Sequence, residues 1–176
     1  EKEMELAKRL FEVGFAIIPA EYKRPLVRVS EWRERWKAGE INWDEIETEL
    51  IKYLNKPGLN LMVLTGINNI YAIDFDSKEV YQDFIEALPN QLRQKVLKTL
   101  TVETRRGFHI YLKCDVENLR PQRMKNGECE WKGYGQQINA PWSVYEDDTE
   151  SRPVRGWSES GIHVEPFSKE EIEIIW

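Results

Sequence analysis

The sequence predicts an α+β fold in which helices pack on a mixed sheet. Some segments carry apolar residues at the three- and four-residue spacing of amphipathic helices, and others are short apolar runs typical of strands. These helices and strands neither alternate strictly nor separate into two halves, which favours an α/β or α+β sandwich. The chain has 176 residues, of which 41% are hydrophobic. That is enough for one well-packed core, so we treat residues 1–176 as a single domain.

Amphipathic patterns predict the helices, and glycine or proline marks the end of the first two. Ser77 has the position of an N-cap for the third helix. The predicted helices cover residues 3–13, 43–55, 78–88 and 90–99. Ser168 and Glu171 have capping-box spacing for a further helix that has barely started where the sequence stops. We therefore expect the chain to be a segment of a longer protein.

Short apolar runs bounded by turn residues predict the strands. The predicted strands cover residues 15–19, 59–66, 70–76, 101–104, 108–114, 128–133 and 136–140. Asn68-Asn69 separates two of these runs, which we expect to be adjacent strands joined by a tight turn. Arg105-Arg106-Gly107 joins another two. The basic segment KRPLVRVSEWRERWK (23–37) is less regular and predicts neither structure.

Charge is distributed unevenly along the chain. The formal net charge is −6, yet residues 91–127 hold nine Lys or Arg against three Asp or Glu, a local charge of +6 that leaves −12 for the rest. A local basic surface suits a ligand rich in phosphate, whereas a charged face that only contacts water is the structural alternative.

The composition also excludes several kinds of protein. The sequence has two cysteines, Cys114 and Cys129, and two histidines, His109 and His163, without a CxxC pair, so we expect no structural zinc. No stretch approaches the roughly 20 apolar residues that span a bilayer, and the N-terminus lacks the apolar core of a signal peptide. We expect a cytoplasmic domain that does not bind membranes.

Two aspartates interrupt the apolar run IYAIDFD. Because side chains alternate across a strand, Asp74 and Asp76 share one face while Ile73 and Phe75 share the other. Close carboxylates raise each other's pKa unless a cation lies between them, and Mg²⁺ or Mn²⁺ prefers oxygen ligands. The pair therefore suits a metal site, although aspartates at the end of a strand also serve as turn or helix caps.

The segment TRRGFHIYLKC (104–114) places His109 on the polar side of an alternating strand. The preceding turn brings Arg105 and Arg106 close to this imidazole, and guanidinium groups bind phosphates through charge-assisted hydrogen bonds. The segment thus suits a polyphosphate site. A surface hairpin with a half-exposed histidine is the alternative.

The segment ECEWKGYGQQINAPWS (128–143) supplies a third carboxylate. Glu128, Glu130 and Lys132 share one face of a predicted strand, opposite Cys129 and Trp131. An exposed edge strand with alternating charges would have the same pattern, so periodicity alone does not decide between the two interpretations.

Together these segments resemble the catalytic motifs of a primase-polymerase (Prim-Pol) domain of the archaeo-eukaryotic primase superfamily, as found in plasmid, viral and prophage replication proteins. NLMVLTGINNIYAIDFD resembles the first motif, TRRGFH the second and CEWKGYGQQINAPWS the third. The opening GFAIIPAEYKRPLVRVSEW is similar to the opening of the family, with Gly14, Pro19, Lys23, Pro25 and Trp32. The resemblance extends over most of the chain, and three motifs in order are more specific than any one.

The resemblance implies a set of site residues. Asp74, Asp76 and Glu130 would hold two divalent metals, Mg²⁺ or Mn²⁺, and His109 would contact the triphosphate of the incoming nucleotide. Further phosphate contacts are expected from Arg106, Lys132 and Ser143. The third acidic residue is more usually Asp in the family, and Glu128 lies on the same face, so the choice of Glu130 rests on its distance from Gly133.

The resemblance also implies a function and an architecture. The function is DNA primase/polymerase activity, a template-directed nucleotidyl transfer from dNTPs or NTPs to a 3′-hydroxyl that makes or extends primers. The implied fold is an N-terminal α/β part and an RRM-like part, with the active site in the cleft between them. The implied partners are single-stranded or primed DNA and, in the same polypeptide, a C-terminal helix-rich accessory domain and a helicase.

Two other functions remain open from the residues alone. A metal-dependent nuclease would use the same carboxylates, but it would have no need for the Arg-Arg-Gly-x-His segment. A catalytically silent nucleic-acid-binding module would use the acidic residues only to end strands, and it would show no dependence on metal.

Overall fold

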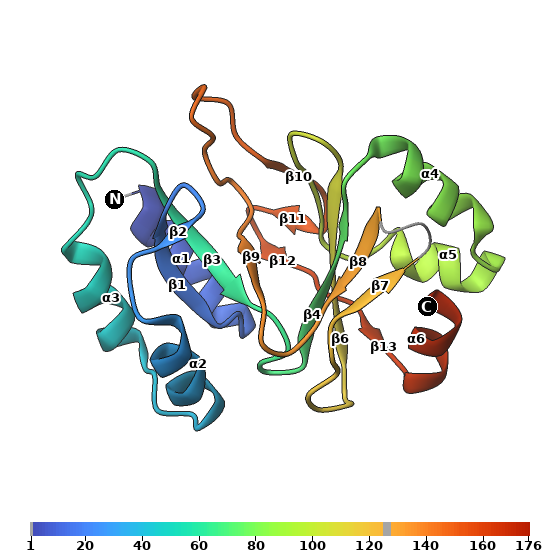
Figure 1. Ribbon diagram of the computed structural model, residues 1–176, viewed down its shortest axis with the longest axis horizontal. Coiled ribbons are helices and arrows are strands. Elements are labelled where there is room, and N and C mark those ends of the chain that lie inside the picture. Colours follow the sequence, from blue (N-terminus) through green and yellow to red (C-terminus); the bar gives the residue numbers. More distant parts are fainter. Residues whose placement is uncertain (1, 125–127) are drawn as a thin grey trace.

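The computed structural model describes residues 2–124 and 128–176 and contains two larger sheets that lie side by side (Figure 1). The first sheet has the strand order β2-β1-β3-β9, and each neighbouring pair is antiparallel. Its strands are β1 (Ile17–Glu21), β2 (Arg24–Pro25), β3 (Leu59–Leu64) and β9 (Gln137–Asn139). Helices and mixed strands together confirm the α+β class that the sequence predicts.

The second sheet has the strand order β10-β5-β6-β4-β8-β7, with β13 added in parallel to β6. Its strands are β4 (Ile70–Phe75), β5 (Thr101–Glu103), β6 (Phe108–Cys114), β7 (Gln122–Met124), β8 (Cys129–Lys132), β10 (Arg152–Arg155) and β13 (Pro166–Phe167). A small ribbon of β11 (Trp157–Ser158) and β12 (Gly161–Ile162) accompanies the two sheets. The central strand β4 is thus flanked by β6 and β8.

The helices divide between the two sheets, as Figure 1 shows. The first sheet is accompanied by α1 (Lys2–Val13), α2 (Val29–Lys37) and α3 (Trp43–Ile51), and the second by α4 (Lys78–Ala87), α5 (Asn90–Val96) and α6 (Lys169–Ile175). The predicted helices are confirmed, although α3 and α5 end earlier than expected. The capping box of Ser168 and Glu171 is present at the start of α6.

Helix α2 forms in the basic segment for which the sequence predicted no regular structure. Trp32 and Trp36, four residues apart, are both buried on the same side of this helix. Trp36 also donates a hydrogen bond from Nε1 to the carbonyl of Ile17 over 3.1 Å. Two large side chains therefore stabilise a helix whose remaining residues are mostly charged. Two apolar residues among so many charged ones are too few for the helical period to be recognised in the sequence.

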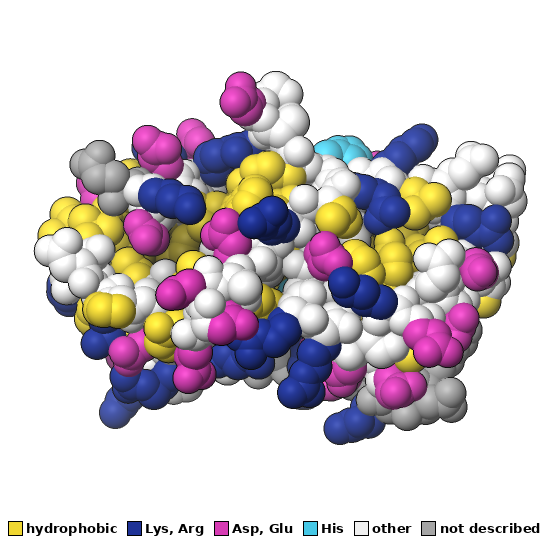
Figure 2. Space-filling model, turned by 90° about the horizontal axis from the view of Figure 1, so that it is seen from above, with side chains coloured by type: hydrophobic (Ala, Val, Ile, Leu, Met, Phe, Trp, Pro, Cys, Tyr) yellow, Lys and Arg dark blue, Asp and Glu magenta, His cyan; other side chains and the backbone are white. Residues whose placement is uncertain are grey.

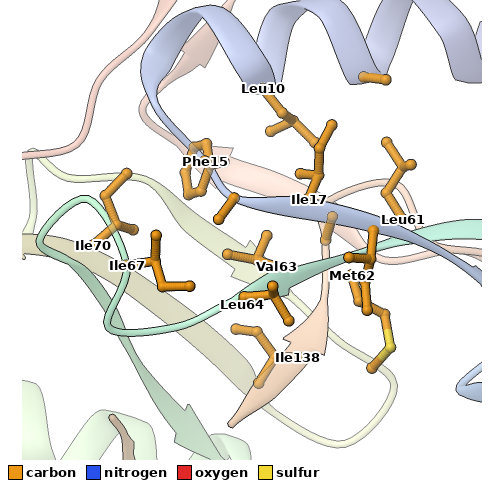
Figure 3. Close-up of a cluster of buried hydrophobic side chains, with 14 of the residues drawn as sticks. Leu10, Phe15, Ile17, Leu61, Met62, Val63, Leu64, Ile67, Ile70 and Ile138 are labelled. Atoms are coloured by element: carbon orange, nitrogen blue, oxygen red, sulfur yellow. The ribbon is translucent and has the colours of Figure 1, made fainter. Parts of the chain in front are cut away.

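Two hydrophobic cores lie on opposite faces of the second sheet. Ala72, Val102 and Tyr111 belong to the core shared with the first sheet and α1 to α3, part of which Figure 3 shows around Phe15 and Ile70. The alternate strand residues, including Ile73, Ile110 and Trp131, belong to the core beneath α4, α5 and α6. Alternation along each strand thus assigns one face to each core.

One predicted pairing is wrong. Strands β3 and β4 follow each other around Asn68-Asn69, but β3 pairs with β1 and β9 in the first sheet while β4 belongs to the second. Asn68 and Asn69 both adopt left-handed backbone conformations, and the Asn68 side chain donates to the carbonyl of Gly14 over 2.8 Å. This contact fixes the turn to the end of α1. A local turn signal does not identify the partners of strands that are buried on both faces.

Strands β2, β7 and β10 to β13 have no clear signal in the sequence. Cys114 and Cys129 are both buried. Lys125, which belongs to the basic segment 91–127, lies outside the described residues. Within the described part of the chain, no helix is both long and apolar enough to cross a bilayer. The expected RRM-like architecture of the second part stays a prediction.

Candidate active site

A row of polar side chains crosses the centre of the second sheet. In the strand register, Asp74 on β4 lies opposite His109 on β6 and, on its other side, opposite Glu130 on β8. Glu130 in turn lies opposite the exposed Arg123 on β7. Residues directly opposite each other project to the same face of a sheet. Residues from four strands, separated by as many as 56 positions in the sequence, therefore share one face.

Asp74 and His109 are in direct contact. Nε2 of His109 lies 3.3 Å from Oδ1 of Asp74, and the two side chains are only 13% and 24% exposed, respectively. Burial by itself would raise the pKa of Asp74. The hydrogen bond and charge of His109, together with the charges of Lys132 and Lys23, outweigh burial and hold this pKa below its usual value of 3.8. Asp74 is therefore an ionised, half-buried carboxylate at neutral pH.

Glu130 has a cationic partner of its own. Nζ of Lys132 lies 3.2 Å from Oε1 of Glu130 on the same strand, and both side chains are largely buried. Lys132 lies opposite Ala72, one step along the face from the Asp74 row. The charge of Lys132 acts on Asp74 as well as on Glu130, since it helps to lower the pKa of Asp74.

Asp76 follows directly after β4 and is exposed. Its backbone N–H donates to the carbonyl of Glu128 over 3.0 Å, which continues the pairing of β4 with β8 by one residue. Alternation then places the Asp76 side chain on the same side as Asp74. Glu128, opposite Asp76, is also exposed. The structure thus brings Asp74, Asp76 and Glu130 to one face, with Glu128 at its outer end.

The Arg-Arg-Gly turn lies against the end of β4. A Cβ atom on Gly107 would lie 2.0 Å from the carbonyl oxygen of Phe75, so only glycine fits this close approach. Arg105 binds Asp147 over 3.3 Å and its guanidinium lies over the ring of Tyr145. Arg106 is exposed, without a hydrogen bond or ion pair in the described part of the chain.

Ser143 is buried in the loop after β9. Its hydroxyl donates to the carbonyl of Ala140 over 2.6 Å, and its backbone N–H donates to the hydroxyl of Ser151 over 3.1 Å. The loop borders a cavity of about 410 Å³ whose other walls include Leu6, Trp142 and Trp157. The hydroxyl of Ser143 is thus engaged in holding this loop, while the other expected site residues lie on the second sheet or the turn before β6.

Tyr111 and Lys23 belong to the site although the sequence did not single out a role for them. Tyr111 is fully buried on the same face as His109, and the two rings lie edge to face with centroids 6.4 Å apart. Burial, together with the charge of Asp74, raises the pKa of Tyr111, which therefore stays neutral. Lys23 is in the turn between β1 and β2 of the first sheet. Its position in a Lys-x-Pro opening was the one signal for it.

Carboxylate oxygens on one face are the donors that a hard divalent cation prefers, so the residues fit Mg²⁺ or Mn²⁺ in kind. Among residues 2–124 and 128–176, however, no three Asp, Glu, His or Cys side chains converge as in a formed metal site. Asp74 is turned to His109 and Glu130 to Lys132. Binding of a cation at this face would require these carboxylates to exchange partners.

The comparison with protein families decides which family this arrangement belongs to. The model of the family Prim-Pol, described as bifunctional DNA primase/polymerase, N-terminal, matches residues 7–166. The chain belongs to the Prim-Pol family. The match includes Asp74, His109 and Glu130, and it indicates a function of the DNA primase/polymerase type. A comparison with curated proteins found no match.

The Prim-Pol domain does not present one continuous basic surface on the face that Figure 2 shows, because Lys and Arg side chains are interspersed there with Asp and Glu. Ion pairs contribute to this mixing in the segment 91–127. Lys95 binds Glu171 over 2.7 Å, and Arg105 binds Asp147 over 3.3 Å. The local excess of positive charge in the sequence is thus partly neutralised by the fold.

Proposed function

We propose that this Prim-Pol chain catalyses template-directed transfer of nucleotides from dNTPs or NTPs to the 3′-hydroxyl of a primer. The observation that supports this most strongly is the register that places His109 and Glu130 on either side of Asp74. Phosphoryl transfer needs little covalent chemistry from the protein, since positioning and charge stabilisation supply most of the catalysis. A carboxylate row beside cationic groups provides both.

In this proposal the carboxylates of the row and His109 have different roles. Asp74, Asp76 and Glu130 would hold Mg²⁺ or Mn²⁺, which when bound supplies Lewis-acid activation of the attacking hydroxyl and neutralises charge on the leaving pyrophosphate. His109 contacts the nucleotide triphosphate. Nδ1 of His109 is buried and has no hydrogen-bond partner in the described part of the chain, so this nitrogen can still form a hydrogen bond.

The groups around the row hold the phosphates. Arg106 is exposed on a turn fixed by Gly107, and Lys132 lies beside Glu130, so each offers a positive charge near the same face. Ser143 is a further expected phosphate contact, one that requires its hydroxyl to leave the carbonyl of Ala140. Single-stranded or primed DNA is the template, and the chain acts within a larger replication protein that carries a helix-rich accessory domain and a helicase.

Incorporation of labelled nucleotides tests the proposal. Wild-type protein is incubated with primed or unprimed single-stranded DNA, labelled dNTPs or NTPs, and Mg²⁺ or Mn²⁺. We expect metal-dependent products that Asp74→Asn reduces by at least about 100-fold, since a charged metal ligand is lost. Asp83→Asn, on the exposed side of α4, is the matched control and should retain activity.

The products distinguish the alternatives. Synthesis without a primer shows priming, and synthesis only from a primer shows extension. Metal-dependent shortening of the DNA without synthesis would replace the proposal with a nuclease. DNA binding with neither activity in any metal would replace it with a silent binding module.

A further inference from the structure

The turn between β1 and β2 is held in one conformation at Tyr22. Tyr22 has a left-handed backbone (φ 52°), which is uncommon for an aromatic residue and is maintained only by its surroundings. The backbone N–H of Tyr22 donates a hydrogen bond to the carbonyl of Gly58 over 2.8 Å. The carbonyl of Tyr22 accepts hydrogen bonds from the side-chain amides of Asn60 and Asn139, each over 3.1 Å. A Cβ atom on Gly58 would lie 2.6 Å from the Tyr22 ring. The residue after Tyr22 is therefore presented by a fixed turn.

Asn139 also connects this turn to the strand that carries His109. The backbone carbonyl of Asn139 accepts a hydrogen bond from the hydroxyl of Tyr111 over 3.3 Å. Tyr111 lies two residues after His109 on β6 and on the same face of the second sheet. The side chain of Asn139 thus holds the Tyr22 turn, and the backbone carbonyl of the same residue contacts the second sheet beside the polar row.

Lys23 is the residue that this turn presents. It is exposed, and its ammonium has no hydrogen bond or ion pair within the described residues. The neighbouring cations Arg24 and Lys56 are not available in the same way, because both form ion pairs with Glu21. The turn that carries Lys23 is connected through Asn139 to Tyr111, which lies on the same face of the second sheet as His109. Lys23 is therefore a positioned cation near the row, and its ammonium is unpaired among the residues that the structure describes.

We propose that Lys23 binds a phosphate group of the substrate from the first-sheet side of the site. The inference rests on the proposed nucleotidyl transfer and adds a residue to it. A lysine ammonium is a compact, mobile point charge that binds phosphate oxygens through charge-assisted hydrogen bonds. The flexible four-carbon side chain allows the ammonium to adjust to the ligand, and the fixed Tyr22 turn limits the conformational entropy that the backbone loses on binding. The phosphate belongs either to the nucleotide triphosphate or to the DNA backbone.

Direct binding measurements separate these two sources without turnover. Calorimetry with dATP and Mg²⁺ but no primer gives the nucleotide Kd, with deoxyadenosine as the ligand that lacks phosphate. Fluorescence anisotropy with single-stranded DNA at several salt concentrations gives the DNA Kd and its salt dependence. The proteins are wild type, Lys23→Gln, Lys23→Arg and, as the matched control on the same hairpin, Arg24→Gln. Thermal unfolding of each variant reports on the fold.

We expect Lys23→Gln to weaken the affinity for one of the two ligands by about 5- to 10-fold, because one charge-assisted contact is lost. Lys23→Arg should restore most of this affinity. Weaker dATP binding with unchanged deoxyadenosine binding identifies the triphosphate. Weaker DNA binding, with a salt slope smaller by about 0.7, identifies the backbone of the single strand. Arg24→Gln should match wild type in both.

Unchanged affinity of Lys23→Gln for both ligands would overturn the inference, as would an equal loss in Arg24→Gln. The proposed function can fail separately, because a wild-type protein that binds dATP or DNA without incorporating nucleotides would refute the catalysis and still test Lys23. Wild-type protein that binds neither ligand would refute both proposals.

Discussion

Asp74 and Glu130 lie directly opposite each other on β4 and β8, and His109 lies opposite Asp74 on the other side. The second glutamate of the segment, Glu128, lies one step further out, opposite Asp76, where both side chains are exposed. There is therefore an inner carboxylate pair, with His109 in contact with Asp74 and Lys132 in contact with Glu130, and an outer pair at the end of β4. This difference in position separates two glutamates that strand alternation alone treats as equivalent.

Exchange of each glutamate for glutamine tests which one is required. Because Glu130 is paired with Asp74 and partly buried, we expect Glu130→Gln to reduce nucleotide incorporation by at least about 100-fold, as removal of a metal ligand does. Glu128→Gln is the matched control and should lower it by less than about 5-fold. Primer-extension rates under saturating dNTPs compare the two. A larger loss in Glu128→Gln would transfer the ligand role to the outer position.

Under the proposed function, Lys132 would compete with a bound cation for Glu130, because the two side chains already form an ion pair. We expect Lys132→Met to tighten Mn²⁺ binding by about 2- to 5-fold, because it removes a partly buried ion pair worth up to about 1 kcal/mol. Electron paramagnetic resonance of free Mn²⁺ measures this affinity directly, without turnover. Lys113→Met, on β6, is the control for loss of a positive charge and should leave Mn²⁺ affinity unchanged. Weaker Mn²⁺ binding in Lys132→Met would show that Lys132 supports the cation site instead of competing with it.

Gly107 positions the Arg105-Arg106 turn against β4. We expect Gly107→Ala to lower the free energy of unfolding by about 1–3 kcal/mol, because the new methyl group would overlap the carbonyl of Phe75 and force the turn outward. Urea unfolding measures the change. Gly161→Ala, where nothing lies within 4 Å of the new methyl group, should cost less than about 1 kcal/mol. Equal costs for both variants would mean that the turn moves without strain.

Glu171 at the start of α6 gives the protein a stability that depends on pH. Burial by itself would raise the pKa of Glu171, but the hydrogen bonds from Lys95 and the Ser168 backbone outweigh it and lower the pKa below 4.5. A lowered carboxyl pKa stabilises the fold fully above the unfolded value, and this contribution disappears as the pH falls through the folded value.

The variant Glu171→Gln should therefore be less stable than wild type by about 0.5–1 kcal/mol at pH 7, and the difference should shrink below pH of about 4. Urea unfolding at several pH values measures both. Glu173→Gln, exposed on the same helix, is the control and should show little difference at any pH. A difference that persists unchanged at low pH would contradict the role of the Glu171 charge.

Local patterns determined much of what the sequence alone established. The amphipathic helices, the N-cap at Ser77, the capping box at Ser168 and the shared face of Asp74 and Asp76 all depend on residues close in the sequence. Each is decided by backbone geometry over a few residues, which explains why α1 and α4 were predicted near their observed bounds and α6 at its start.

Tertiary structure decided the rest, because strand pairing is a relation between distant segments. Alternation assigned His109 and Glu130 to polar faces, but only the register of β6 and β8 against β4 brought both beside Asp74. The same limit caused the wrong pairing of β3 with β4. The position of Lys23 depends on the hydrogen bonds that Asn60 and Asn139, from two other strands of the first sheet, donate to the carbonyl of Tyr22. No local pattern carries these relations, since they arise from burying two faces of one sheet in two cores.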